Sequence, residues 1–386
     1  MKFKKSLLLP MLVFLLILPT SGFSAEKDSS AGRYIVYSDS LFWRNTLGKR
    51  HDFKSYFSTG LSEFQVRLVK LFGLKIEPVG TLFVLEEDAV AEEEATAPNY
   101  PQARVPWGVS LLGNGLEAVP FGGDKIRVAI LDTGVDTDHP DLESRVALCK
   151  DFSNPSVAFE DGACEDFNGH GTHVAGIIGA NGGSQKVGIY GVAPQAELLV
   201  YKTCDSTGKC FADDIAAAIA DALKERAQII NLSFGSDADL AILKNAIKAT
   251  SSKDAIVVSG LGNDGPYPES IDYPAAYSQV LGASAFNIDQ EVPDWSSRSS
   301  VADFFVLPGV DVQSTWIEGK YNIVSGTSVA AAHLSGLLAR YWQIESDTPA
   351  KATLDFVKNL VTSSVSKEER DYFGRGFPHD PVSTEE

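Results

Sequence analysis

After about residue 105 the chain alternates between two patterns of apolar positions. Short runs of Val, Ile, Leu and Ala predict buried strands, and the segments between them repeat their apolar residues every three or four positions, as helices do. The pattern predicts strands at 126–131, 198–202, 229–232, 255–258 and 280–285, and helices at 170–180, 213–226, 239–251, 327–343 and 350–360. Fully apolar strands alternating with helices are typical of a buried parallel sheet. We therefore expect an α/β fold: a doubly wound, mostly parallel sheet with helices on both faces.

The first 25 residues have the pattern of a secretory signal peptide. Lysines follow Met1, an apolar run covers residues 7–18, and small residues lie at 21–25. The run is shorter than the ~20 apolar residues that span a bilayer, which argues against a membrane anchor. We expect a secreted protein, extracellular or periplasmic, with no membrane contact after maturation.

Residues 26–104 have a different character. A strand at 33–37, an amphipathic helix at 61–72 and a strand at 81–85 predict a small α+β unit. The acidic stretch at 86–94 and the proline-containing stretch at 97–104 are typical of an exposed linker. The sequence thus predicts three parts, at 1–25, 26–104 and 105–386.

The last of these parts is strongly acidic. The whole chain has 33 Lys and Arg against 51 Asp and Glu, and residues 105–386 hold 20 against 39. Nucleic acids and anionic membranes are bound by clustered positive charge, so the acidity argues against both as partners. Solubility is the simpler explanation for it.

The four cysteines fall into two close pairs, Cys149 with Cys164 and Cys204 with Cys210. In an exported chain, local pairing is the best of the three possible disulfide connectivities. A bridge that closes a loop of ~15 residues contributes about 3 kcal/mol in the chain-entropy model. A zinc site is the weaker alternative, because neither pair has the short spacing or the nearby histidines of tetrahedral sites.

Three segments with reactive side chains follow one another: Val128-Ala-Ile-Leu-Asp-Thr-Gly134, Asn168-Gly-His-Gly-Thr-His-Val-Ala-Gly176 and Ser325-Gly-Thr-Ser-Val-Ala330. They supply an acid, a base and a nucleophile where strand, turn and helix signals meet, which is where an α/β sheet displays functional groups. In sequence, order and approximate spacing they resemble the triad segments of the subtilisin-like serine proteases, the subtilase family. The resemblance covers nearly the whole chain after Val105.

This resemblance implies a role for each reactive residue and no cofactor for catalysis. Ser328 would be the nucleophile, His170 the base that takes its proton, and Asp132 the group that orients the imidazole. Asn263, in Ser259-Gly-Leu-Gly-Asn-Asp-Gly265, matches the asparagine that donates to the oxyanion together with the backbone N–H of Ser328. Residues 26–104 would be the propeptide, which assists folding and occupies the active site until it is cut.

The resemblance also indicates where a substrate binds. Two segments match those that flank the peptide in this family, and extended peptides bind such edges through main-chain hydrogen bonds. Their residues are Ser233, Phe234, Gly235, Gly260, Leu261 and Gly262. The loop at 205–209 matches the opposite edge, and a Cys204–Cys210 bridge would pin it.

Asp272 lies in Ile271-Asp-Tyr-Pro-Ala275, a stretch that aligns with the floor of the family's primary pocket. A buried carboxylate there would favour a basic side chain at P1, the substrate residue before the cleaved bond. Arg104 precedes a stretch that resembles the mature N-terminus, so self-cleavage after Arg104 is the matching hypothesis. The alternative is that Asp272 turns outward and the cut lies elsewhere.

A structural calcium site is a further expectation from the resemblance. Asp141 matches a calcium ligand of the family, and residues 181–189 occupy the position of the partner loop, with Gln185 as a side-chain ligand. Asp141 could equally cap a turn.

Together these observations predict a secreted, self-activating serine endopeptidase, a monomer whose partners are polypeptide substrates and its own propeptide. The alternative from another class is a non-catalytic binding protein with a subtilase fold. A lipase-type hydrolase is excluded, because the chain lacks a Gly-x-Ser-x-Gly segment and its triad order differs. A metalloprotease is disfavoured, because His170 and His173 lack the spacing of two ligands one helical turn apart.

Overall fold

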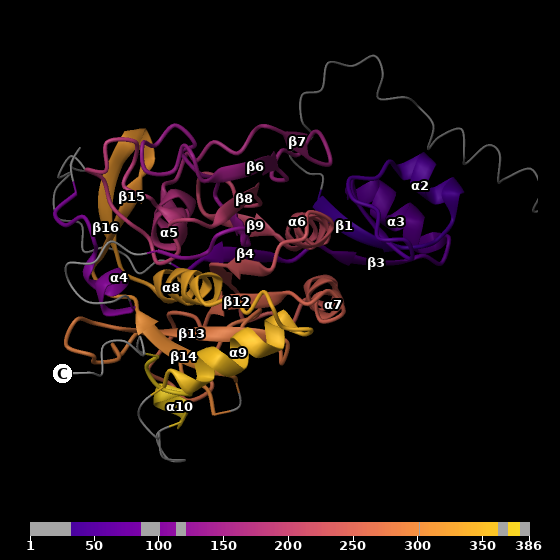
Figure 1. Ribbon diagram of the computed structural model, residues 1–386. Helices are drawn as coiled ribbons and strands as arrows, with labels where there is room; N and C mark the ends of the chain where they lie inside the picture. Colours follow the sequence, from indigo (N-terminus) through magenta and orange to yellow (C-terminus); the bar gives the residue numbers. More distant parts are fainter. Residues whose placement is uncertain (1–31, 86–100, 113–120, 301, 362–369, 379–386) are drawn as a thin grey trace, which may run out of the picture. The chain divides into compact units, whose positions relative to one another are not determined.

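The computed structural model describes residues 32–85, 101–112, 121–300, 302–361 and 370–378. The expected signal peptide, residues 1–25, lies outside them. By its contacts the chain divides into two compact units, Met1–Gly80 and Thr81–Glu386 (Figure 1). Among the described residues, no helix combines the length and the apolar character needed to cross a membrane.

The first unit is a three-stranded antiparallel sheet with two helices. Its elements are β1 (Gly32–Tyr37), α2 (Leu41–Leu47), β2 (Phe57–Leu61), α3 (Glu63–Leu71) and β3 (Lys75–Pro78), and the strand order is β2-β1-β3. Helix α3 begins at a capping box, in which Ser62 Oγ accepts the Gln65 N–H and Gln65 Oε1 accepts the Ser62 N–H. The predicted strand at 33–37 and helix at 61–72 are confirmed.

The second unit contains an eight-stranded sheet in the order β14-β13-β12-β10-β5-β8-β6-β7. The strands are β5 (Arg127–Asp132), β6 (Val146–Asp151), β7 (Glu160–Asp161), β8 (Glu197–Lys202), β10 (Ile229–Leu232), β12 (Ile256–Gly260), β13 (Val280–Phe286) and β14 (Phe304–Pro308). All neighbouring pairs are parallel except β6 with β7. The five predicted strands are the buried centre of this sheet.

Helices cover the sheet in two packed pairs. Helix α5 (His170–Gly179) packs on α8 (Thr327–Arg340), and α6 (Ala212–Lys224) packs on α7 (Ala241–Thr250) (Figure 1). In the chain, α5 directly precedes β8, and α6 directly precedes β10. The remaining helices are α4 (Trp107–Leu112), α9 (Pro349–Asn359) and α10 (Arg370–Phe373), with a short 3-10 turn at Ile317–Gly319.

Two smaller sheets complete the second unit. A hairpin joins β15 (Val312–Trp316) to β16 (Lys320–Val324), and a three-stranded antiparallel sheet has the order β11-β4-β9. Its strands are β4 (Thr81–Val84), β9 (Lys209–Phe211) and β11 (Phe234–Gly235). The strand predicted at 81–85 is therefore present, but it belongs to the larger unit and not to the sheet of the first.

Both local disulfides are present. Cys149 bonds to Cys164 across 15 positions, and Cys204 bonds to Cys210 across 6 positions. The pairing predicted from the sequence is confirmed.

Candidate active site

Asp132 and His170 meet at the carboxyl edge of the large sheet. Asp132 is the last residue of β5, and His170 is the first residue of α5. The His170 Nδ1 lies 2.7 Å from Asp132 Oδ1, and each side chain is only 1% exposed. The helix begins close to the strand because Gly171 has no side chain, and a Cβ there would lie 2.1 Å from the Gly134 carbonyl oxygen. The sequence thus folds so that the imidazole is held by a carboxylate.

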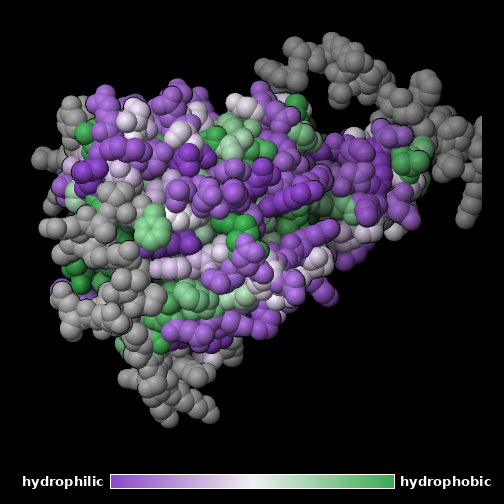
Figure 2. Space-filling view, viewed as in Figure 1, coloured by the Kyte–Doolittle hydropathy of each residue, from purple (hydrophilic) through white to green (hydrophobic). Residues whose placement is uncertain are grey.

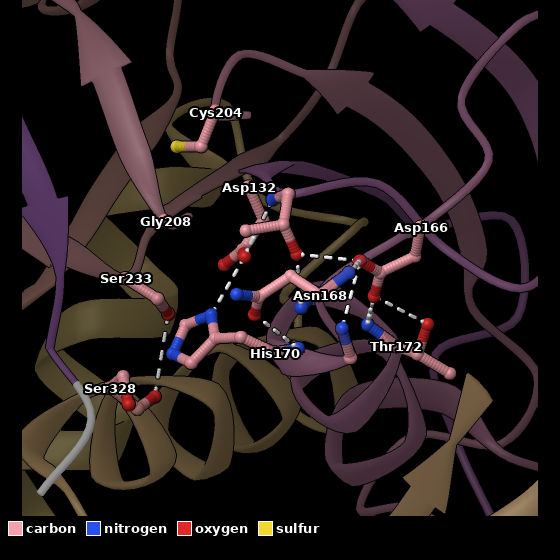
Figure 3. Close-up of polar contacts among 12 residues, drawn as sticks. Asp132, Asp166, Asn168, His170, Thr172, Cys204, Gly208, Ser233 and Ser328 are labelled. Carbon is pink, nitrogen blue, oxygen red and sulfur yellow. Dashed lines mark hydrogen bonds and ion pairs between the residues drawn. The ribbon is translucent and has the colours of Figure 1, made fainter. Parts of the chain in front are cut away.

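A second buried carboxylate, Asp166, orders the turn that leads to His170. Its Oδ1 accepts the hydroxyl of Thr133 and the backbone N–H groups of Asn168 and Gly169, and its Oδ2 accepts the N–H and hydroxyl of Thr172 (Figure 3). Burial opposes ionisation of Asp166, but these hydrogen bonds outweigh burial and lower its pKa. Asp166 therefore fixes the entry to α5 as a carboxylate.

Ser328 is the second residue of α8, and Asn263 lies just beyond the end of β12. In Figure 3 the His170 ring lies between the Asp132 carboxylate and Ser328. The Oδ1 of Asn263 accepts the N–H and the hydroxyl of Thr327, at 3.1 and 2.9 Å. Its Nδ2 and the Ser328 Oγ are both buried, and neither has a hydrogen-bond partner among the described residues. The buried amide donor of Asn263 is thus attached to Thr327, the residue directly before the buried hydroxyl of Ser328.

Strand β4 lies beside this hydroxyl in the groove between β11 and β9. It pairs antiparallel with β11 on one side and with β9 on the other, so it is the middle strand of a small sheet. The Leu85 N–H donates to the Ser233 carbonyl at 3.0 Å, and the Val84 N–H donates to the Gly208 carbonyl at 3.1 Å. Ser233 also contacts the segment of Ser328, because its Oγ donates to the Ser328 carbonyl at 3.4 Å. An extended segment is therefore held by main-chain hydrogen bonds beside Ser328.

The outer edge of this groove is covalently fixed. Cys210 is the middle residue of β9 and pairs with Leu82 of β4, while Cys204 lies at the other end of the same loop. The Asn168 side chain, two residues before His170, donates to the carbonyl of Ser206 in that loop at 3.2 Å. The disulfide and this bond hold the loop against the histidine segment.

The segment around Leu261 and the one around Gly235 border the buried side chain of Asp272. Asp272 is 4% exposed, and its N–H donates to the Leu261 carbonyl at 2.8 Å. A Cβ on Gly235 would lie 2.5 Å from Asp272 Oδ2, and one on Gly262 would lie 3.0 Å from it. The carboxylate therefore points inward between the two segments.

Two further carboxylates surround Asp272. One oxygen each of Asp237, Asp264 and Asp272 lie within 4.8 Å of one another. Burial, together with the smaller effect of the charges of Asp264 and Asp237, raises the pKa of Asp272 to about 7. This part of the groove therefore offers concentrated negative charge.

Comparison with known proteins identifies the family. The profile of the subtilase family matches residues 123–377. The chain belongs to the subtilase family. It is 34% identical to the Subtilisin of Bacillus sp. (strain TA39), covering 95% of this chain and 96% of that protein. It is 30% identical to Subtilisin E of Bacillus subtilis (strain 168), covering 97% of each.

Solved structures agree with this assignment. The S41 Psychrophilic Protease has a TM-score of 0.67 and 35% identity, covering 72% of this chain and 99% of its own. Sphericase has a TM-score of 0.64 and 36% identity, covering 67% and 91%. The subtilase is thus a serine endopeptidase, and the predicted α/β fold class is confirmed.

The calcium site that the resemblance implies can be tested at Asp141. This carboxylate is 1% exposed, and its Oδ2 accepts two hydrogen bonds from within the chain. The Ile189 N–H donates to it at 2.9 Å, and the Tyr321 hydroxyl donates at 2.8 Å. This oxygen of Asp141 is thus already engaged.

The partner loop at 181–189 also carries a cation of its own. The Lys186 ammonium donates to the Asn181 carbonyl at 3.1 Å, and the Gln185 side chain is exposed. Calcium requires six to eight oxygen ligands that converge on one point. Because Asp141 Oδ2 already accepts two hydrogen bonds and Gln185 is exposed, the contacts of these two residues do not favour the expected calcium site, which stays a prediction.

Other parts of the subtilase site were not anticipated from the sequence. They are the hydrogen bonds of Asp166 and a buried lysine, Lys202, at the end of β8. A signal existed for both, because Asp166 lies four positions before His170 and Lys202 ends a predicted apolar strand. By contrast, His173 and His333 are structural: burial lowers their pKa values to about 3 and about 4.

Proposed function

We propose that this subtilase is a secreted, self-activating endopeptidase that cleaves peptide bonds through Asp132, His170 and Ser328 and prefers a basic residue at P1. The supporting observation is that an extended segment of the chain, β4, is paired antiparallel between β9 and β11 beside Ser328. A groove that takes one extended peptide by main-chain hydrogen bonds accepts others of varied sequence.

The chemistry follows from the contacts at the site. Asp132 holds the His170 ring so that Nδ1 carries a proton and Nε2 can act as a base toward Ser328. His170 takes the hydroxyl proton while the Ser328 Oγ bonds to the carbonyl carbon, and it returns that proton to the leaving amine as the C–N bond breaks. Water then enters by the same route and releases the acid from Ser328.

Asn263 supports the charge that develops in this reaction. Its Oδ1 accepts hydrogen bonds from Thr327, which leaves the Nδ2 group as a fixed donor with no competing partner in the part of the chain that the structure describes. A donor that is aligned before the reaction need not reorganise during it, and losing one such donor reduces turnover by roughly 10²- to 10³-fold. We assign Nδ2 and the Ser328 N–H to the carbonyl oxygen of the cleaved bond.

The position of the groove supports a sequence of two cuts in maturation. The Leu85 N–H donates to the Ser233 carbonyl in the groove between β9 and β11. The Arg104 carbonyl instead accepts the Tyr190 N–H at 2.9 Å, outside that groove. We assign the first cut to the bond after Leu85, within one molecule. The cut after Arg104 then requires a second molecule, and it meets the acidic pocket around Asp272.

Following the precursor and its Ser328→Ala variant by mass and N-terminal sequence tests this proposal. Wild type is expected to shorten first to Glu86 at a rate independent of protein concentration, and then to Val105 at a rate that rises with concentration. The variant should remain intact alone, and added active enzyme should cut it only after Arg104, which releases the whole segment before Val105 in one piece with no intermediate that begins at Glu86. The Ser328→Ala variant should have no peptidase activity. The control variant Ser252→Ala, at an exposed serine, should behave as wild type.

The result also separates the alternatives. Peptidase activity that persists in Ser328→Ala would reject the catalytic assignment. A mature N-terminus at neither position would reject the two cuts and leave the chemistry intact. A correctly folded wild type without peptidase activity would favour the non-catalytic binding protein.

A further inference from the structure

Lys202 is an unusual residue for the interior of a sheet. It is the last residue of β8 and only 6% exposed. In the parallel register it lies opposite Asp132, the last residue of β5. A buried ammonium is unfavourable unless it is paired, so its presence beside the catalytic aspartate requires an explanation.

The Lys202 ammonium makes one direct contact with the catalytic segment. Its Nζ donates to the carbonyl of Thr133, the residue that follows Asp132. The same Thr133 donates its hydroxyl to Asp166 and its N–H to Asp132 Oδ1. Lys202 therefore holds the turn from which the Asp132 carboxylate reaches His170.

Two opposing effects act on the charge of Lys202. Burial lowers its pKa below the ordinary value, and carboxylates from four segments limit that fall: Asp166 before α5, Asp151 on β6, Asp132 on β5 and Asp205 in the disulfide-linked loop. The ring of Phe167 covers the ammonium at 5.4 Å from its centroid. Figure 3 shows Asp132 and Asp166 from this group around the turn that Lys202 holds.

We propose that Lys202 is a positioning residue for the Asp132–His170 pair, which fixes the Thr133 carbonyl and keeps one positive charge beside Asp132. This inference rests on the proposed function of Asp132 and His170. The charge disfavours protonation of the nearby imidazole, so the base stays available at lower pH. The hydrogen bond keeps the carboxylate in line with Nδ1.

Three substitutions separate the charge from the hydrogen bond. Lys202→Arg keeps both, Lys202→Gln keeps a donor without the charge, and Lys202→Met removes both. The readout is the pH dependence of kcat/KM on one peptide substrate, with folding checked by thermal melting. Lys150→Met is the matched control, because Lys150 is also a poorly exposed lysine, on the neighbouring strand β6, and its ammonium bonds to Asp221 at 2.6 Å.

The expected result is a graded one. The acid limb of the profile moves up by about half a pH unit in both Lys202→Gln and Lys202→Met. Only Lys202→Met loses kcat in addition, roughly tenfold, because the turn is no longer held. Lys202→Arg and Lys150→Met keep the wild-type limb.

A surface variant covers the case in which the interior substitutions prevent folding. Phe167 is 63% exposed, so Phe167→Ala should fold, and it admits water to the ammonium and should move the limb in the same direction by less. If the limbs of Lys202→Gln and Phe167→Ala coincide with wild type, Lys202 is structural only and the inference is wrong. If Ser328→Ala retains the activity, the proposed function fails instead.

Discussion

Replacing Asp272 with Asn removes one buried negative charge from the groove and keeps the shape of the side chain. The pKa of Asp272 rises from 3.8 to about 7, chiefly through burial. That shift corresponds to roughly 4 kcal/mol of unfavourable free energy for charging the empty pocket. A cation at P1 that offset this cost would favour a basic side chain by roughly 10³-fold.

We expect about a 10²-fold fall in the preference for Arg or Lys over Leu at P1, because a long cationic side chain remains partly hydrated. The assay compares kcat/KM for peptide amides that differ only at P1. In wild type the preference should grow as the pH rises through about 7, where Asp272 ionises, and in Asp272→Asn it should not depend on pH. Asp161→Asn, at an exposed site on β7, controls for net charge.

The same charge has a consequence for stability with a definite sign. The folded-state pKa lies above the unfolded value of 3.8, so ionisation of Asp272 favours the unfolded state as the pH rises from 3.8 to about 7. Asp272→Asn should therefore be more stable than wild type above pH 7, and no different below pH 3.8, in the inactive Ser328→Ala background. A variant with unchanged P1 preference would refute the reasoning, and so would a stability gain that does not vary with pH.

Two further predictions concern the cross-links and the loop at 181–189. Replacing Cys204 and Cys210 with Ser should raise KM for long peptides several-fold with little change in kcat, because β9 loses its anchor; an unchanged KM would contradict this. Replacing Cys149 and Cys164 with Ser should instead lower the free energy of unfolding by about 3 kcal/mol. Lys186→Met should lower the melting temperature, because the hydrogen bond of Lys186 to the Asn181 carbonyl is lost. A chelator should leave amide hydrogen exchange of the loop at 181–189 unchanged, and faster exchange with chelator would show that calcium binds there.

The centre of the large sheet could be predicted because its strands are buried on both faces. A continuous apolar run such as Ile229–Leu232 has few other interpretations. Strand β6, next to the edge strand β7, and the hairpin strand β16 were not predicted, since polar residues interrupt them. Their pairing depends on tertiary neighbours that no local pattern specifies.

The reactive residues could be identified because their segments resemble a family, but their supporting contacts could not. Thr81–Val84 has the same strand pattern whether it pairs within the first unit or between β9 and β11. Lys202 ends an apolar run, and only the parallel register brings it level with Asp132. Both features depend on contacts between residues far apart in sequence.

The place of β4 in the chain also decides how strongly the groove must bind it. A segment attached to its own binding site competes at an effective concentration in the millimolar range, without diffusing to it. Even a weak fit of Leu85 in an acidic groove therefore keeps the groove filled while the chain is intact. Once the bond after Leu85 is broken, the same segment must bind as a separate molecule, and at micromolar protein its occupancy falls by dilution alone. A single cut thus turns an affinity that is sufficient within one chain into one that is insufficient between two.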